Sequence, residues 1–222
     1  MKSFISKLFA SLCLLIGVSC TSKTASRMPI YIMPWYNSEG LVINVGKYSE
    51  ALKQNTSVAL LETARQMKEH LDQVPIEAFY VLAVRLYDMG EKEESAYWFY
   101  VAQFRARVFN GMLAEVGSIG DKGFELRQAF ASFNQLAGTY INGYIGGNVD
   151  KWVQVIERAG ETCKNMGYVG VPYPDIKFKP GAEQPAIVAS VYKGLMELKE
   201  KISNEKKEIE RIRKENGVDG KY

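Results

Sequence analysis

From residue 56 onward, apolar side chains recur at intervals of three and four residues, which is the spacing of one face of an α-helix. Thr56 or Ser57 is expected to cap the first of these helices. Its apolar face is expected to carry Val58, Leu61 and Ala64. The same period returns along most of the remaining chain and predicts an all-α fold.

Prolines and glycines divide this region into successive helices. Pro75 is expected to begin the second helix, which ends at Gly90. A third helix is expected from about Lys92 to the glycine-containing connector 117–123, and a fourth follows that connector. Asn148 is expected to cap a fifth helix. Connections this short favour helices that pack as antiparallel neighbours.

The end of the chain is expected to be a loop followed by one long helix. Residues 167–185 contain four prolines and are expected to form a loop or an extended wrap. Residues 186–222 are expected to be helical as far as about Asn216, and this helix either caps the bundle or pairs with a partner helix. Glu205 is expected to be buried in its heptad seam, which is otherwise formed by Leu195, Leu198, Ile202, Ile209 and Ile212.

A different pattern precedes the helices. Residues 30–33 and 41–45 are β-rich runs, separated by Pro34 and the turn-like residues 37–40. They predict a short β-hairpin or an extended arm. Residues 29–185 are therefore predicted to form one compact domain of antiparallel helical hairpins with this arm at its start.

The first residues have the organisation of a signal peptide. Lys2 and Lys7 are basic, and the apolar run Leu8–Val18 is shorter than the roughly 20 residues that a spanning helix needs. Residues 1–19 are therefore predicted to be removed, which lowers the net charge from +3 by the two lysines. A nearly neutral mature chain gives no electrostatic reason to expect nucleic acid as a partner.

The residues GVSC at 17–20 resemble the bacterial lipobox, with Gly17 standing where Leu or Val is usual. The resemblance implies that Cys20 is lipidated, with acyl chains such as palmitate, and that residues 20–28 form a tether. Thr21, rather than Asp, follows the cysteine. By resemblance to Gram-negative lipoproteins, this implies an outer-membrane anchor with the domain facing the periplasm.

Two other fates of the N-terminus remain open. Gly17 and Ser19 also satisfy the rule for ordinary secretory cleavage, which releases a soluble periplasmic or secreted protein, and the segment can also stay as an uncleaved anchor. Under lipidation Cys13 is lost and Cys20 carries lipid, so Cys163 is expected to be a small buried hydrophobe without a disulfide. Ordinary cleavage leaves a Cys20–Cys163 bridge open.

Residues 79–102 have the spacing of a tight helical hairpin. Small residues such as Ala83 on the first helix and Ala102 on the second let the two helices approach closely, while Phe79 and Phe99 fill the groove beside them. This spacing resembles the tetratricopeptide repeat and its Sel1-like relatives, with Ala83 replacing the usual Gly and Ser95 the usual Ala. The resemblance covers one repeat and implies a TPR-like fold that binds protein.

The same hairpin holds an unusual density of aromatic side chains. The run at residues 97–100 places bulky rings on several faces of one helix. Either another helix of the domain covers the outer rings, or Trp98 and Tyr100 line a groove for a partner. The same two interpretations apply to Trp35 and Tyr36 in the N-terminal arm.

No recognisable catalytic or metal-binding motif is present in the sequence. His70 is the only histidine and is expected to be solvated at a helix end. The connector 117–123 lacks the Gly-Lys-Ser/Thr ending of a phosphate loop. Glu115, Glu125 and Asp150 are the carboxylates that a hydrolase would need, but nothing in the sequence pairs them. We therefore expect no enzyme, cofactor or metal site.

These observations together predict a lipid-anchored protein of the outer membrane whose helical domain binds another protein. An assembly factor for an envelope complex and an immunity protein that neutralises a toxin fit equally well. The alternative from another class is a small-molecule-binding protein or a hydrolase of the cell envelope.

Overall fold

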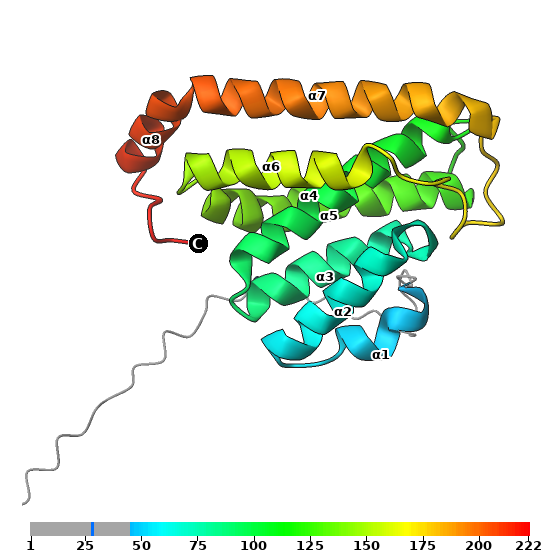
Figure 1. Cartoon of the computed structure of the whole chain (residues 1–222), viewed down its shortest axis with the longest axis horizontal. Coiled ribbons are helices and arrows are strands. Elements are labelled where there is room, and N and C mark those ends of the chain that lie inside the picture. The colour runs from blue at the N-terminus through cyan, green and yellow to red at the C-terminus, as the bar shows by residue number, and fades with distance from the viewer. Residues whose placement is uncertain (1–27, 29–44) are drawn as a thin grey trace, which may run out of the picture.

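The computed structural model describes Met28 and residues 45–222, and these residues form helices joined by loops, with no β-strand among them (Figure 1). The predicted all-α fold is confirmed. The elements are η1 (Gly46–Tyr48), α1 (Ser49–Leu52), α2 (Ser57–Glu69), η2 (Leu71–Gln73), α3 (Ile76–Asp88), α4 (Lys92–Met112), α5 (Lys122–Ile145), α6 (Val149–Cys163), η3 (Gly181–Glu183), α7 (Gln184–Asn204) and α8 (Lys206–Glu215).

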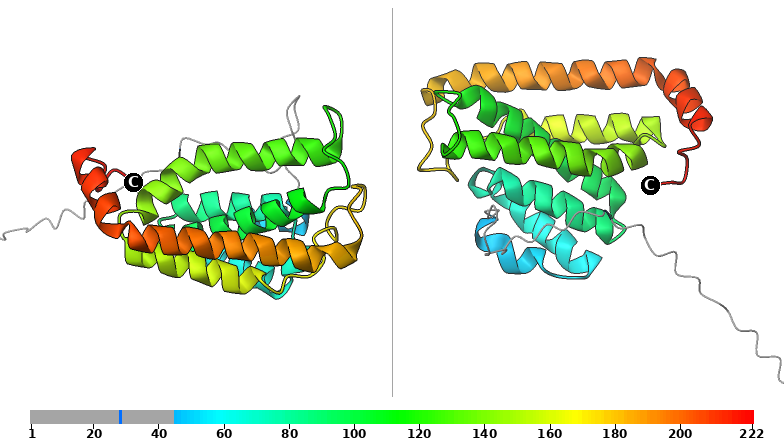
Figure 2. Two further views of the ribbon diagram at one scale, coloured as in Figure 1. Left: turned by 90° about the horizontal axis from the view of Figure 1, so that it is seen from above. Right: turned by 180° about the vertical axis from the view of Figure 1, so that it is seen from behind.

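Helix α4 lies at the centre of the bundle. It packs against α3, α5, α6 and α7, while α7 lies along α6 and forms an outer layer. Figure 2 shows this arrangement from above and from behind, with α1 and α2 beside α3. Because neighbours surround α4, two thirds of its residues are buried. No helix in the described part of the chain is long and apolar enough to cross a membrane.

Side-chain caps fix where several helices begin. The Thr56 hydroxyl accepts a hydrogen bond from the Ala59 N–H at 3.3 Å, and Asn148 accepts one from the Lys151 N–H at 3.0 Å. Both predicted caps are confirmed. Helix α5 begins earlier than expected, because Asp121 caps it through the Phe124 N–H at 2.9 Å.

Helices α3 and α4 form the antiparallel hairpin that the small residues predict. The Ser95 hydroxyl donates a hydrogen bond to the Ala83 carbonyl oxygen at 2.7 Å, and both residues are fully buried. Only small side chains allow two helix backbones to approach this closely. The contact confirms a tight hairpin, which is a feature of many helical folds besides tetratricopeptide repeats.

A larger side chain at position 83 should overpack this contact. We expect Ala83→Leu to lower the free energy of unfolding by about 1–3 kcal/mol, because the added methylenes must push the helices apart. Ala131→Leu, at an exposed position of α5, is the matched control and should change stability by less than about 0.5 kcal/mol. Denaturant unfolding measures both, and equal stability of the two variants contradicts the packing described.

The C-terminal helix departs from the expected single rod. The chain turns at Glu205, where α7 ends and α8 begins, and Figure 1 shows α8 bending back toward the bundle. Glu205 is exposed, so the prediction of a buried seam carboxylate is wrong. A charge in the seam is costly to bury, and the break lets the carboxylate face solvent instead.

The N-terminal predictions fall mostly outside the described residues. This applies to the signal peptide, Cys20, Trp35, Tyr36 and the predicted hairpin. Met28 is described and buried, and its backbone N–H donates a hydrogen bond to Asp88 Oδ1 at 3.0 Å. The chain therefore meets the domain at the C-terminal end of α3.

Candidate functional site

The aromatic run at the start of α4 lies inside the domain. Trp98 is 2% exposed and Tyr100 is 3% exposed, so neither side chain offers a surface to a partner. The interpretation of these two residues as groove-lining anchors is wrong for this structure. The alternative, in which other helices of the domain cover the rings, is confirmed.

Contacts from three helices account for this burial. The Trp98 ring stacks on Phe79 of α3 at 5.6 Å between centroids. The Tyr100 hydroxyl accepts a hydrogen bond from Trp152 Nε1 at 2.7 Å and donates one to Asn142 Oδ1 at 3.1 Å. Burial raises the pKa of Tyr100 to about 12. The rings therefore join α3, α5 and α6 to the central helix.

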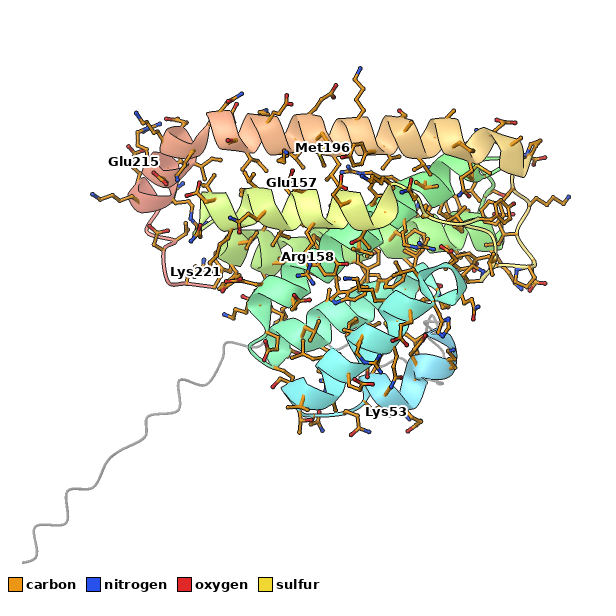
Figure 3. All side chains as sticks on the ribbon, viewed as in Figure 1. Lys53, Glu157, Arg158, Met196, Glu215 and Lys221 are labelled. Carbon is orange, nitrogen blue, oxygen red and sulfur yellow. The ribbon has the colours of Figure 1, made fainter. Side chains whose placement is uncertain are left out.

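Helix α6 also covers the outer ring of the run. The Arg158 guanidinium lies 3.8 Å from the centre of the Tyr97 ring and pairs with Glu94. Figure 3 labels Arg158 and its neighbour Glu157 on α6. Beyond it, Glu157 of α6 pairs with Lys199 of α7 at 3.2 Å. The face of α4 that the sequence left unassigned is thus covered first by α6 and then by α7.

The carboxylates considered for a hydrolase do not form a paired site. Glu115, Glu125 and Asp150 are all exposed, and Asp150 pairs with Lys206 at 2.6 Å. His70 is exposed at the end of α2, as expected. Among Met28 and residues 45–222, no group of three His, Cys, Asp or Glu side chains is placed to hold a metal ion.

Cys163 is a buried free thiol at the end of α6. Burial raises the pKa of this thiol to about 12, so it stays protonated and is a poor nucleophile. The expectation that it serves as a small buried hydrophobe is confirmed.

Two connections meet at one end of the bundle. They are residues 113–121, between α4 and α5, and residues 164–183, between α6 and α7; we call them together the loop end (Figure 1). Leu113 forms an antiparallel bridge with Phe178, and the Ala114 N–H donates to the Lys177 carbonyl oxygen at 3.1 Å. The two connections therefore support each other.

The loop end exposes large apolar side chains. Ile119 is 91% exposed and Val116 is 69% exposed, and Tyr168 and Val171 are exposed on the second connection. Gly117 and Gly120, which lie on either side of Ile119 in the first connection, both have positive φ angles, a backbone conformation that glycine adopts without steric cost. Sequence reasoning missed these residues because it treated the glycines only as breaks between helices.

A groove adjoins the loop end. It has a volume of about 530 Å³ and opens between the end of α6 and the start of α7. Met166, Pro185 and Val188 give it an apolar lining, and Lys164 lies at its edge. Its size and lining suit an apolar side chain of a partner or a small molecule.

The loop end lies far from the point where Met28 joins the domain. Met28 contacts Asp88, next to the turn that begins α4, and the loop end starts where α4 finishes. Helix α4 has 21 residues, which corresponds to a length of about 31 Å. The two features therefore occupy opposite ends of the bundle.

A buried polar cluster fixes the 164–183 connection to α3. Tyr173 donates a hydrogen bond from its hydroxyl to Glu77 Oε2 at 2.5 Å, and the same hydroxyl accepts one from the Ile76 N–H at 2.7 Å. Nearby, the Gly167 N–H donates to Asp72 Oδ1 at 2.9 Å. These contacts join residues more than 90 positions apart in sequence.

The electrostatics of this cluster are dominated by burial. Glu77 is 2% exposed, and desolvation raises the pKa of its carboxyl to about 7, although the Tyr173 hydrogen bond acts in the opposite direction. Burial and the neighbouring carboxyl also raise the pKa of Tyr173 well above its ordinary value. Nη1 of the buried Arg105 lies 3.5 Å from Asp72 Oδ1 and forms an ion pair with it. The same Nη1 has no hydrogen-bond partner.

Comparisons with known proteins assign no family to the chain. No family model matches it, and no solved structure matches it. A protein of Haemophilus influenzae, described as "Uncharacterized protein", is 28% identical over 206 residues, which cover 91% of this chain and 74% of the relative. The similarity extends over nearly all of this chain, and the relative's description names no activity or partner.

Proposed function

We propose that this protein is a lipid-anchored protein of the outer membrane that binds another protein through its loop end. The observation that carries the proposal is the exposure of Ile119 and Val116, which a monomeric domain gains nothing from displaying together. Apolar anchors beside a groove are typical of the centre of a protein interface.

The proposed anchor orients the loop end relative to the membrane. Residues 20–28 span at most about 28 Å when fully extended, so a lipid on Cys20 holds the Met28 end of the domain near the membrane. The loop end is at the opposite end of α4 and can reach into the periplasm. This arrangement suits the capture of a partner that approaches from the periplasmic side.

Two roles fit this proposal equally well, an assembly factor for an envelope complex and an immunity protein that captures a toxin. Genes for immunity proteins lie beside toxin genes, so the genomic neighbourhood separates the two roles. A small-molecule-binding role is the second candidate, and the groove of about 530 Å³ is the feature that favours it.

Affinity capture from detergent-solubilised envelopes tests the protein-binding role. The wild-type chain is expected to retain one partner in near-stoichiometric amount, and Ile119→Ser should reduce its recovery at least about tenfold, as expected for an interface anchor. Val58→Ser is the matched control, because Val58 is also an exposed apolar residue, 77% exposed, but lies on α2. Equal recovery with both variants contradicts binding at the loop end.

A further inference from the structure

We infer that Glu77 and Tyr173 form a proton-dependent latch, which holds the 164–183 connection against α3 while Glu77 is protonated and loosens when Glu77 ionises. The latch itself is independent of the proposed function. An effect of the latch on partner binding rests on the proposed function, because residues 164–183 form part of the loop end.

The latch lies near the middle of the connection, at Tyr173. Tyr173 is buried, and its single hydroxyl joins both the Glu77 carboxyl and the first N–H of α3. The second attachment, between Gly167 and Asp72, involves a half-exposed carboxylate. The exposed residues Tyr168 and Val171 lie between the two attachments, so their position depends on both.

The titratable and charged groups near the latch are connected to Glu77 through Tyr173. Tyr173 hydrogen-bonds Glu77 and interacts electrostatically with Arg105 on α4. Arg105 in turn interacts with Asp72 on η2 and Cys163 on α6. Arg105 is paired with Asp72, and the side chain that hydrogen-bonds Glu77 is the neutral Tyr173. An ionised Glu77 in this place is therefore a buried carboxylate without a cation in direct contact.

The direction of the pH effect follows from this environment. Because burial raises the pKa of Glu77 from 4.5 to about 7, the closed connection is favoured most below the ordinary glutamate pKa. This preference declines as the pH rises toward 7 and is lost above it. Opening the connection lets water reach the carboxylate, so the open state gains population as the pH rises.

Hydrogen exchange measured by mass spectrometry on the full-length protein tests the latch. After correction for the intrinsic pH dependence of exchange, the opening equilibrium of residues 164–183 should rise by about tenfold to a hundredfold between about pH 5.5 and about pH 8. Glu77→Gln keeps an oxygen that accepts the Tyr173 hydrogen bond and cannot ionise. This variant should show the same protection at both pH values.

Two further variants keep the test decisive. His70 is an exposed polar side chain that also lies at the α2–α3 junction, so His70→Gln is the control that should retain the wild-type response. Tyr173→Phe should raise exchange in residues 164–183 at both pH values. An unchanged pH response in Glu77→Gln, or unchanged protection in Tyr173→Phe, overturns the latch. If the wild-type chain captures no partner but the exchange of residues 164–183 still depends on pH as described, only the proposed function is contradicted.

Discussion

Trp98→Ala should lower the free energy of unfolding by about 3–5 kcal/mol. The indole is 2% exposed and stacks on Phe79, so truncation removes a large buried ring and leaves a cavity between α3 and α4. Chemical denaturation followed by circular dichroism measures the change. A loss of this size makes Trp98→Ala a stability variant and not a test of partner binding.

Trp98→Phe is the matched control for this substitution. The indole Nε1 has no hydrogen-bond partner, so phenylalanine keeps a ring against Phe79 and loses no hydrogen bond. We expect it to be clearly more stable than Trp98→Ala. If Trp98→Ala unfolds like the wild type but no longer captures the partner, the indole is a surface anchor and the packing described here is wrong.

Cys20→Ala should move the protein from the membrane fraction to the soluble periplasmic fraction. Several acyl chains on one cysteine hold a protein firmly at a membrane, so removing the cysteine that is proposed to carry them removes the proposed anchor. Fractionation with immunoblotting measures the distribution, and labelling with a palmitate analogue reports the lipid directly. We expect nearly complete loss of both signals.

Cys163→Ala separates lipidation from a general effect of losing a cysteine. Cys163 is a buried free thiol, so this variant should keep the label and remain in the membrane fraction. Continued membrane association of Cys20→Ala contradicts the lipid anchor. Retention of that variant in a form that is not cleaved at position 19 favours the uncleaved-anchor alternative.

The features that were predicted correctly from the sequence depend on local interactions. Thr56 and Asn148 cap helices through backbone groups three residues away, and Pro75 precedes the helix that it was expected to begin. The Ala83–Ser95 contact lies within one hairpin, and small residues at those positions indicate close packing. Residues close together in the sequence determine each of these features, so a single sequence was sufficient to predict them.

The features that were missed depend on contacts between distant parts of the chain. The sequence does not show that Trp98 packs on α3 and that α6 contacts Tyr100, because an aromatic run has the same pattern in a core and in a groove. Glu77 lies in a helix that is apolar all round, and its partner Tyr173 is 96 residues away in a proline-rich loop. Glu205 interrupted a heptad seam, but only the structure shows that the helix itself breaks there.

The central claim is that the loop end binds a protein partner, and site-specific photo-crosslinking in intact cells tests it most directly. A photoreactive amino acid is placed at position 119 in one strain and at position 58 in another, because both native side chains are exposed apolar residues on different parts of the domain. We predict one discrete crosslinked protein from position 119 and none from position 58. No crosslink from position 119, while the tagged wild-type chain still captures its partner, contradicts the account.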